Sequence, residues 1–135
     1  AHTDGDAIVF FKNANVVHMG DIYFAQQFPF IDVGSGGSVH GVIAAINKVI
    51  ERSDEKTKII PGHGQITDVK VLGSYRDMLV NVRDRVANAK STGKTLEAFV
   101  AEKPIADLDV IWGKGFIKAD QLLNFVWNSA SAHTH

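Results

Sequence analysis

The chain has 135 residues, a mass of 14.7 kDa, a net charge of −1 and no cysteine. This length accommodates one domain, residues 1–135, and 45% apolar with 21% charged residues is typical of a globular protein rather than a disordered one. The absence of cysteine excludes disulfides, thiolate metal ligands and thiol nucleophiles, so any bound metal must be held by His, Asp or Glu.

The first elements predicted along the chain are the two strands of a β-hairpin. Residues 7–11 and 16–19 are β-branched and aromatic runs, and an Asn-containing turn separates them. We expect Gly20–Asp21 to end the second strand. Residues 22–37, which are aromatic without periodicity and then rich in glycine, are expected to form a loop.

The remaining segments indicate helices and one more strand. From Ser38 onward, apolar residues recur at steps of three and four, which predicts a helix to Ile50 with Ser38 as its N-cap. The later elements, in chain order, are a short strand at 59–60, a helix from Thr67 or Asp68 to just before Gly93, a helix capped by Thr95 and ended by Pro104, a loop through 112–115, and a last helix around 122–127.

Together these elements predict an α/β (α+β) domain with a short, mostly antiparallel sheet that about four helices cover on one face. The hairpin strands are apolar on both faces, so the second face needs a cover of its own. No apolar run approaches the roughly 18 residues of a membrane span, and no basic patch indicates nucleic-acid binding. We therefore expect neither a membrane nor a nucleic acid as partner. The compartment, cytoplasmic or periplasmic, stays open.

Three potential metal ligands stand beside glycines at predicted strand ends. His2 precedes the first strand, Asp21 follows the second, and His63 follows the third. Ligands at the ends of adjacent strands meet at one edge of a sheet. Two imidazoles and a carboxylate are a sufficient protein ligand set for hydrolytic zinc, although iron and manganese accept the same donors.

The ordered set resembles the C-terminal half of the metallo-β-lactamase fold hydrolases. The residues that carry the resemblance are His2–Asp6, Gly20–Asp21, the glycine-rich Gly36–Ser38, Ile60–Gly64 and Trp112–Phe116. They occur in the order of that family, with 19 residues from His2 to Asp21 and 42 from Asp21 to His63. The resemblance implies half of an αββα sandwich.

The resemblance also implies roles for individual residues. His2 would be a ligand of a first zinc, Asp21 would bridge two zinc ions, and His63 would bind the second. Asp4 and Asp6 either orient His2 or form a turn. The implied activity is metal-dependent hydrolysis of a small-molecule ester, thioester, amide or phosphoester, and the substrate itself is not indicated.

The His-x-His-x-Asp-His motif of the family is absent from these residues. We therefore expect this segment alone to bind zinc weakly or not at all and not to hydrolyse substrate at a useful rate. We also expect its open sheet face to pair in a homodimer or with a missing N-terminal half. Two alternatives stay open: a non-catalytic self-associating or partner-binding module, and a mononuclear metal site made by His2, Asp21 and His63 together.

Several other residues have simpler interpretations. His18 is expected in the core or in a cross-strand contact rather than as a ligand, and Ser38 is explained by helix capping. Lys114, between two glycines, suggests an anion contact but matches no phosphate-binding loop. Aromatic residues near Asp21 could wall a pocket or pack the loop: Tyr23, Phe24, Phe28 and Phe30.

Overall fold

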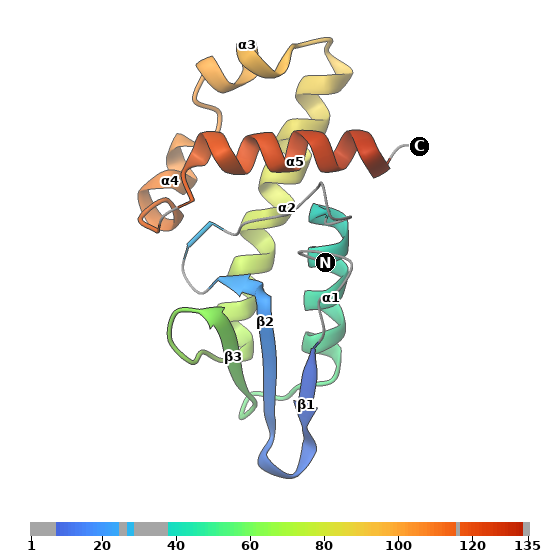
Figure 1. Cartoon of the computed structure of the whole chain (residues 1–135), viewed down its shortest axis with the longest axis vertical. Coiled ribbons are helices and arrows are strands. Elements are labelled where there is room, and N and C mark those ends of the chain that lie inside the picture. Colours follow the sequence, from blue (N-terminus) through green and yellow to red (C-terminus); the bar gives the residue numbers. More distant parts are fainter. Residues whose placement is uncertain (1–7, 25–26, 29–37, 116, 134–135) are drawn as a thin grey trace.

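The computed structural model describes residues 8–24, 27–28, 38–115 and 117–133 (Figure 1). The sheet consists of β1 (Val9–Phe11), β2 (Val16–Phe24) and β3 (Lys58–His63). The α-helices are α1 (Val39–Glu51), α2 (Val69–Ser91), α3 (Leu96–Ala101), α4 (Ala106–Trp112) and α5 (Ala119–His133). None of the helices in these ranges is both long and apolar enough to cross a membrane.

The sheet has the strand order β1-β2-β3 and is mixed. β1 and β2 pair antiparallel, with Phe10 opposite Val17, whereas β2 and β3 pair parallel, with Val17 opposite Ile59. The expectation of a mostly antiparallel sheet is therefore wrong. Its physical reason is the connection: α1 carries the chain back along the sheet before β3, as a parallel pairing requires.

β2 is longer than the sequence predicted. It continues through Gly20–Asp21 to Phe24, so the expectation that Gly20–Asp21 ends the strand is wrong. The pairing with β3 shifts register twice, between His18 and Gly20 and between Gly20 and Phe24. These irregularities explain the discrepancy, because bulges allow a strand to continue through a glycine and a polar residue that would otherwise stop it.

Three of the predicted helix starts are confirmed by side-chain caps. Ser38 Oγ accepts from the Gly41 amide at 3.0 Å, so capping accounts for this serine. Asp68 Oδ1 accepts from the Val71 amide at 2.9 Å, and the Thr95 hydroxyl accepts from the Ala98 amide at 3.2 Å. Polar caps before amphipathic runs thus set where α1, α2 and α3 begin.

α4 lies between Pro104 and the loop predicted at 112–115, where the sequence predicted no helix. Its N-cap residue, Ile105, makes no side-chain cap, and Trp112 is the one buried residue within it. Neither a capping residue nor a periodic apolar pattern in the sequence therefore indicated this helix. A tertiary contact fixes its start instead: the Arg85 guanidinium of α2 donates to Pro104 O at 3.0 Å and to both carboxylate oxygens of Asp107.

The core lies between the helices and one face of the sheet, here called the inner face. Figure 1 shows α1 and α2 running alongside the sheet, and α5 crossing α2. The inner face contributes Phe10, Val17, Met19 and Ile59, of which the last three are at most 3% exposed. Facing residues include Val42 and Ile46 of α1, Leu72, Tyr75 and Leu79 of α2, and Leu122, Leu123 and Val126 of α5.

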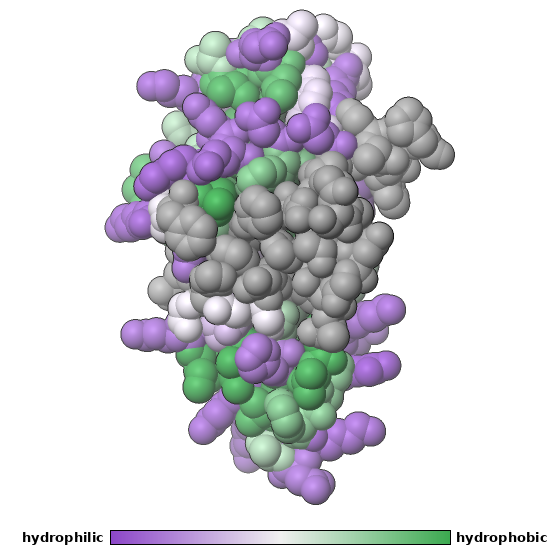
Figure 2. Space-filling view, in the orientation of Figure 1, coloured by the Kyte–Doolittle hydropathy of each residue, from purple (hydrophilic) through white to green (hydrophobic). Residues whose placement is uncertain are grey.

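The opposite face of the sheet, here called the outer face, is open. Val9 is opposite His18 in the register and Phe11 is opposite Val16, and the side chains of Val9 and Phe11 are 47% and 51% exposed. Figure 2 shows hydrophobic residues gathered over the strands in the lower part of the view, with hydrophilic side chains among them. The prediction of an apolar sheet face without cover from the helices is confirmed for these residues.

Candidate metal centre

The structure describes the backbone at two of the three predicted metal ligands. Asp21 lies within β2, and His63 is the last residue of β3. His2 lies outside the described residues, as do Asp4 and Asp6. Of the predicted site, the structure therefore describes the backbone of β2 and β3.

Asp21 and His63 lie at the same edge of the sheet. Because β2 and β3 are parallel, their carboxyl ends share one edge, and the register pairs Gly20 with Pro61 and Phe24 with His63. Asp21 follows directly on the first of these pairs, and His63 belongs to the second. The two predicted ligands are thus on neighbouring strands within one short stretch of register.

The backbone around Asp21 is irregular. Between Gly20 and Phe24, three residues of β2 stand opposite the single residue Gly62 of β3, so Asp21 lies inside a bulged segment. Gly20 has φ of +56°, which glycine adopts without the penalty of a side chain. Bulges re-aim side chains and are enriched beside active sites.

His18 makes a local hydrogen bond at the irregular part of β2. It is exposed, so its predicted place in the core is wrong, and it stands in cross-strand register with Val9 and Ile60, as the alternative had it. Its Nδ1 accepts a hydrogen bond from the Gly20 amide at 3.1 Å. The neutral ring must then carry its proton on Nε2.

A buried aromatic stack supports β2 behind the bulge. The ring centroids of Tyr23 and of Tyr75 on α2 are 4.7 Å apart, and those of Tyr75 and of Trp112 on α4 are 6.1 Å apart. The Thr67 hydroxyl donates to the Tyr23 hydroxyl at 3.1 Å. Burial is the main cause that raises the pKa of Tyr23 above its ordinary value; the Thr67 hydrogen bond opposes it, and the charge of Asp68 adds to it.

The predicted aromatic wall is therefore packing rather than pocket for the residues that the structure describes. Tyr23 and Phe28 are fully buried in the core. The side chain of Phe24 and the whole of Phe30 lie outside the described part of the chain.

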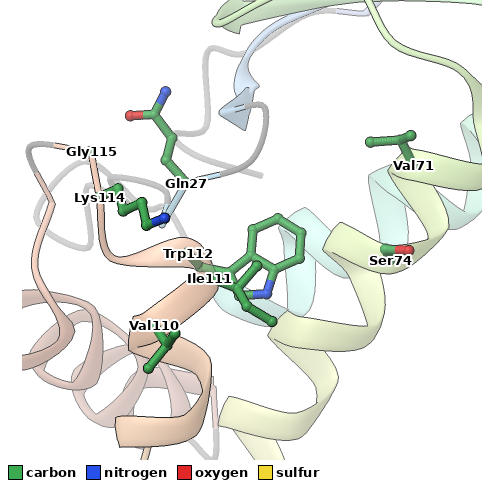
Figure 3. Close-up of a pocket in the computed structure, with 8 residues that line it drawn as sticks. All are labelled: Gln27, Val71, Ser74, Val110, Ile111, Trp112, Lys114 and Gly115. Carbon is green, nitrogen blue, oxygen red and sulfur yellow. The ribbon is translucent and has the colours of Figure 1, made fainter.

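A cavity of about 830 Å³ lies between α2 and the end of α4 (Figure 3). Trp112, Ile111 and Lys114 line it from α4 and the following turn, and Val71 and Ser74 line it from the first turns of α2. Sequence reasoning missed this feature because it depends on α4. The consecutive apolar pair Val110–Ile111 between acidic residues and glycines was the available signal.

The donor set fits a hydrolytic metal. Imidazole and carboxylate are ligands that zinc accepts, and two of the three predicted donors lie on neighbouring strands. Among the side chains that the structure describes, no group of three or more His, Asp or Glu is arranged to hold a metal ion.

Comparison with solved structures identifies the fold of the larger part of the chain. VMB-1 matches 59% of this chain with a TM-score of 0.50 and 21% identity. A metallo-β-lactamase from Pontibacter korlensis also matches 59% of the chain, with a TM-score of 0.50 and 18% identity. The matched part thus has the fold of part of a metallo-β-lactamase.

The match is partial in both directions. The chain spans just over a third of the length of these structures, 36% of VMB-1 and 37% of the Pontibacter enzyme. No protein-family model and no curated protein matches the sequence. The mixed α/β architecture and the metallo-β-lactamase resemblance are confirmed, and identities near 20% carry the comparison no further than the fold.

Proposed function

We propose that this chain is the C-terminal part of a metal-dependent hydrolase of the metallo-β-lactamase type, with His2, Asp21 and His63 as its contribution to a zinc centre. The observation that carries the proposal is that Asp21 and His63 lie on two neighbouring parallel strands, Asp21 within the bulged part of β2 and His63 at the end of β3, in a chain of which 59% has the fold of part of a metallo-β-lactamase. The fold match does not favour the alternative, a non-catalytic association module.

The chemistry follows from the donor types. Zinc, when bound by such ligands, lowers the pKa of a coordinated water to near neutrality and so supplies a hydroxide nucleophile. The chain's own contribution is the backbone that carries the ligands: Asp21 lies within the bulged part of β2, and His63 is the last residue of β3. The buried Tyr23–Tyr75 stack keeps β2 in place behind the site.

In the proposed arrangement His2 would help to hold one metal ion, His63 would help to hold a second, and Asp21 would serve both. Neither ion then has the three protein ligands that catalytic zinc ordinarily takes. We therefore propose that the chain alone binds zinc weakly and hydrolyses substrate slowly or not at all.

The test is calorimetric titration of the metal-free chain with zinc. We expect weak uptake that Asp21→Asn and His63→Ala each abolish. His40→Ala is the control, because His40 is a histidine of α1 and belongs to neither β2 nor β3. Uptake that survives both ligand substitutions, or that is lost with His40→Ala, would contradict the proposed ligands. Tight uptake of one zinc per chain would indicate the mononuclear site instead.

A further inference from the structure

The structure assigns the cavity between α2 and the α4 turn as a binding site for a small molecule with an apolar body and an anionic end group. The binding site is inferred independently of the zinc proposal. Its interpretation as the place where the non-reacting part of a substrate lies rests on the proposed function.

The size and position of the cavity suit a small molecule. Its volume of about 830 Å³ is within the roughly 300–1,000 Å³ of ordinary ligand pockets. Gln27, three residues beyond the end of β2, lines one side of it, and the Phe28 amide donates to Trp112 O at 2.9 Å. The cavity is therefore attached to the segment that directly follows the strand of Asp21.

The side of the cavity that α4 forms carries apolar side chains that are exposed to solvent. Val110 and Ile111 are 71% and 62% exposed, the two highest values among the large hydrophobic residues that the structure describes as exposed. Trp112, which is 8% exposed, lies between them and α2 and is backed by Tyr75 at 6.1 Å. A rigid aromatic floor beside exposed aliphatic side chains is a surface that gains free energy when an apolar group covers it.

The charge of the cavity selects an anion. Lys114 is its cationic side chain, and no Asp or Glu is among the described residues that line it. Figure 3 shows the Lys114 side chain extending between Gln27 and Trp112. The Gln27 amide and the Ser74 hydroxyl add neutral hydrogen-bonding groups at opposite sides of the space. A carboxylate at the Lys114 end is thus the complementary group.

The glycines on both sides of Lys114 lie in close contact with other side chains. A Cβ on Gly113 would collide with the Asp109 carboxylate, and one on Gly115 would collide with the Gln27 side chain. The Lys118 ammonium donates to the carbonyl oxygens of Gly113 and Gly115 at 3.3 and 3.0 Å. These contacts constrain the backbone on both sides of Lys114.

The experiment is a fluorescence titration of the zinc-free chain with octanoate. Trp112 and Trp127 are the two tryptophans of the chain, so Trp127→Phe leaves Trp112 as the reporter. We expect saturable quenching or a spectral shift by octanoate. We expect weaker binding of octanol, which has the same chain without the charge, and none of octylammonium.

Substitutions locate the binding. Lys114→Met should weaken octanoate roughly tenfold and leave octanol unchanged, since it removes one charge-assisted hydrogen bond. Ile111→Ser should weaken both ligands. Val9→Ser is the matched control, because Val9 is also exposed and aliphatic but lies on the outer face of the sheet.

Three outcomes would overturn the assignment: no saturable binding of octanoate, binding that neither Lys114→Met nor Ile111→Ser changes, or octylammonium that binds as well as octanoate. Chelator is present throughout, so a negative result leaves the zinc titration as a separate test of the proposed function. Equally, failure of the zinc titration would leave an octanoate site without a substrate role.

Discussion

The two faces of the sheet differ in how much of their stabilisation lies within this chain. On the inner face, Val17 and Ile59 are 3% and 0% exposed and belong to the core that the sheet shares with the helices. On the outer face, Val9 and Phe11 are 47% and 51% exposed although they are as apolar as their inner counterparts. Apolar residues on an open face are a surface that a partner can cover.

The carboxyl edge of the sheet also differs from the packed interior. There β2 departs from regular pairing, Gly20 has a positive φ, and Asp21 and His63 stand on adjoining strands. The packed interior holds the fully buried residues of the core, whereas Val9 and Phe11 of the outer face are exposed.

The largest effect expected from the outer face is association. In a solution of this chain alone, the surface best matched to that face is the same face of a second copy, so we predict a homodimer with micromolar affinity, about 8 kcal/mol. At about 100 μM, well above that dissociation constant, light scattering should give close to twice the 14.7 kDa chain mass. Phe11→Glu, which places a charge on the face, should restore the single-chain mass, and a wild-type monomer at about 100 μM would contradict the prediction.

A valine pair compares the faces directly. Val17→Ala removes two buried methyl groups from the inner face and should lower the free energy of unfolding by about 2 kcal/mol. Val9→Ala makes the same chemical change on the outer face and should cost less than about 1 kcal/mol. Urea denaturation of both variants at a concentration where the chain is monomeric measures the difference. Equal costs would mean that the outer face is covered in solution.

The same contrast explains how much of the fold could be predicted from the sequence. α1, α2 and α3 begin at polar caps that precede amphipathic runs, so local and tertiary signals agree and the predicted starts are confirmed. α4 depends on Arg85, which lies far from it in the sequence, and therefore left no local pattern. The parallel pairing of β3 was likewise not indicated by any turn residue.

For the candidate site, the sequence predicted that metal ligands lie at strand ends, and the structure shows two of these positions on neighbouring strands. The bulges that hold Asp21 within β2 could not be predicted, because register depends on the partner strand. The cavity beside α4 was missed with its helix. Of its lining residues, the sequence singled out Trp112, Lys114 and Gly115, which belong to the segment Trp112–Phe116, without predicting a cavity there.

Two glycines sharpen the comparison between the edge and the interior. Neither Gly20 nor Gly73 has an atom within 4 Å of an added Cβ, so alanine at either position tests backbone conformation alone. Gly20→Ala should destabilise by about 1 kcal/mol, because its φ of +56° disfavours a side chain. Gly73→Ala, inside α2, should stabilise by roughly 0.5 to 1 kcal/mol. Thermal unfolding should show a lower melting temperature for Gly20→Ala and a higher one for Gly73→Ala than for the wild type. Destabilisation by both substitutions would contradict the prediction for Gly73.

The smallest effect concerns Tyr23, which joins the edge to the interior. Tyr23→Phe removes the hydrogen bond from Thr67 and should cost about 1 kcal/mol near neutral pH. Burial raises the folded-state pKa of Tyr23 above the ordinary 10.0, so above that pH the unfolded chain loses the proton first and the wild type loses stability.

Phenylalanine has no such proton, and the advantage of the wild type over Tyr23→Phe should therefore shrink as the pH rises from 8 to 11. Urea unfolding of both proteins across this range measures the difference, in which the titration of lysines common to both cancels. A constant difference would show that the Tyr23 hydroxyl reaches water in the folded chain. The stack behind β2 would then be less tightly closed than the interior it adjoins.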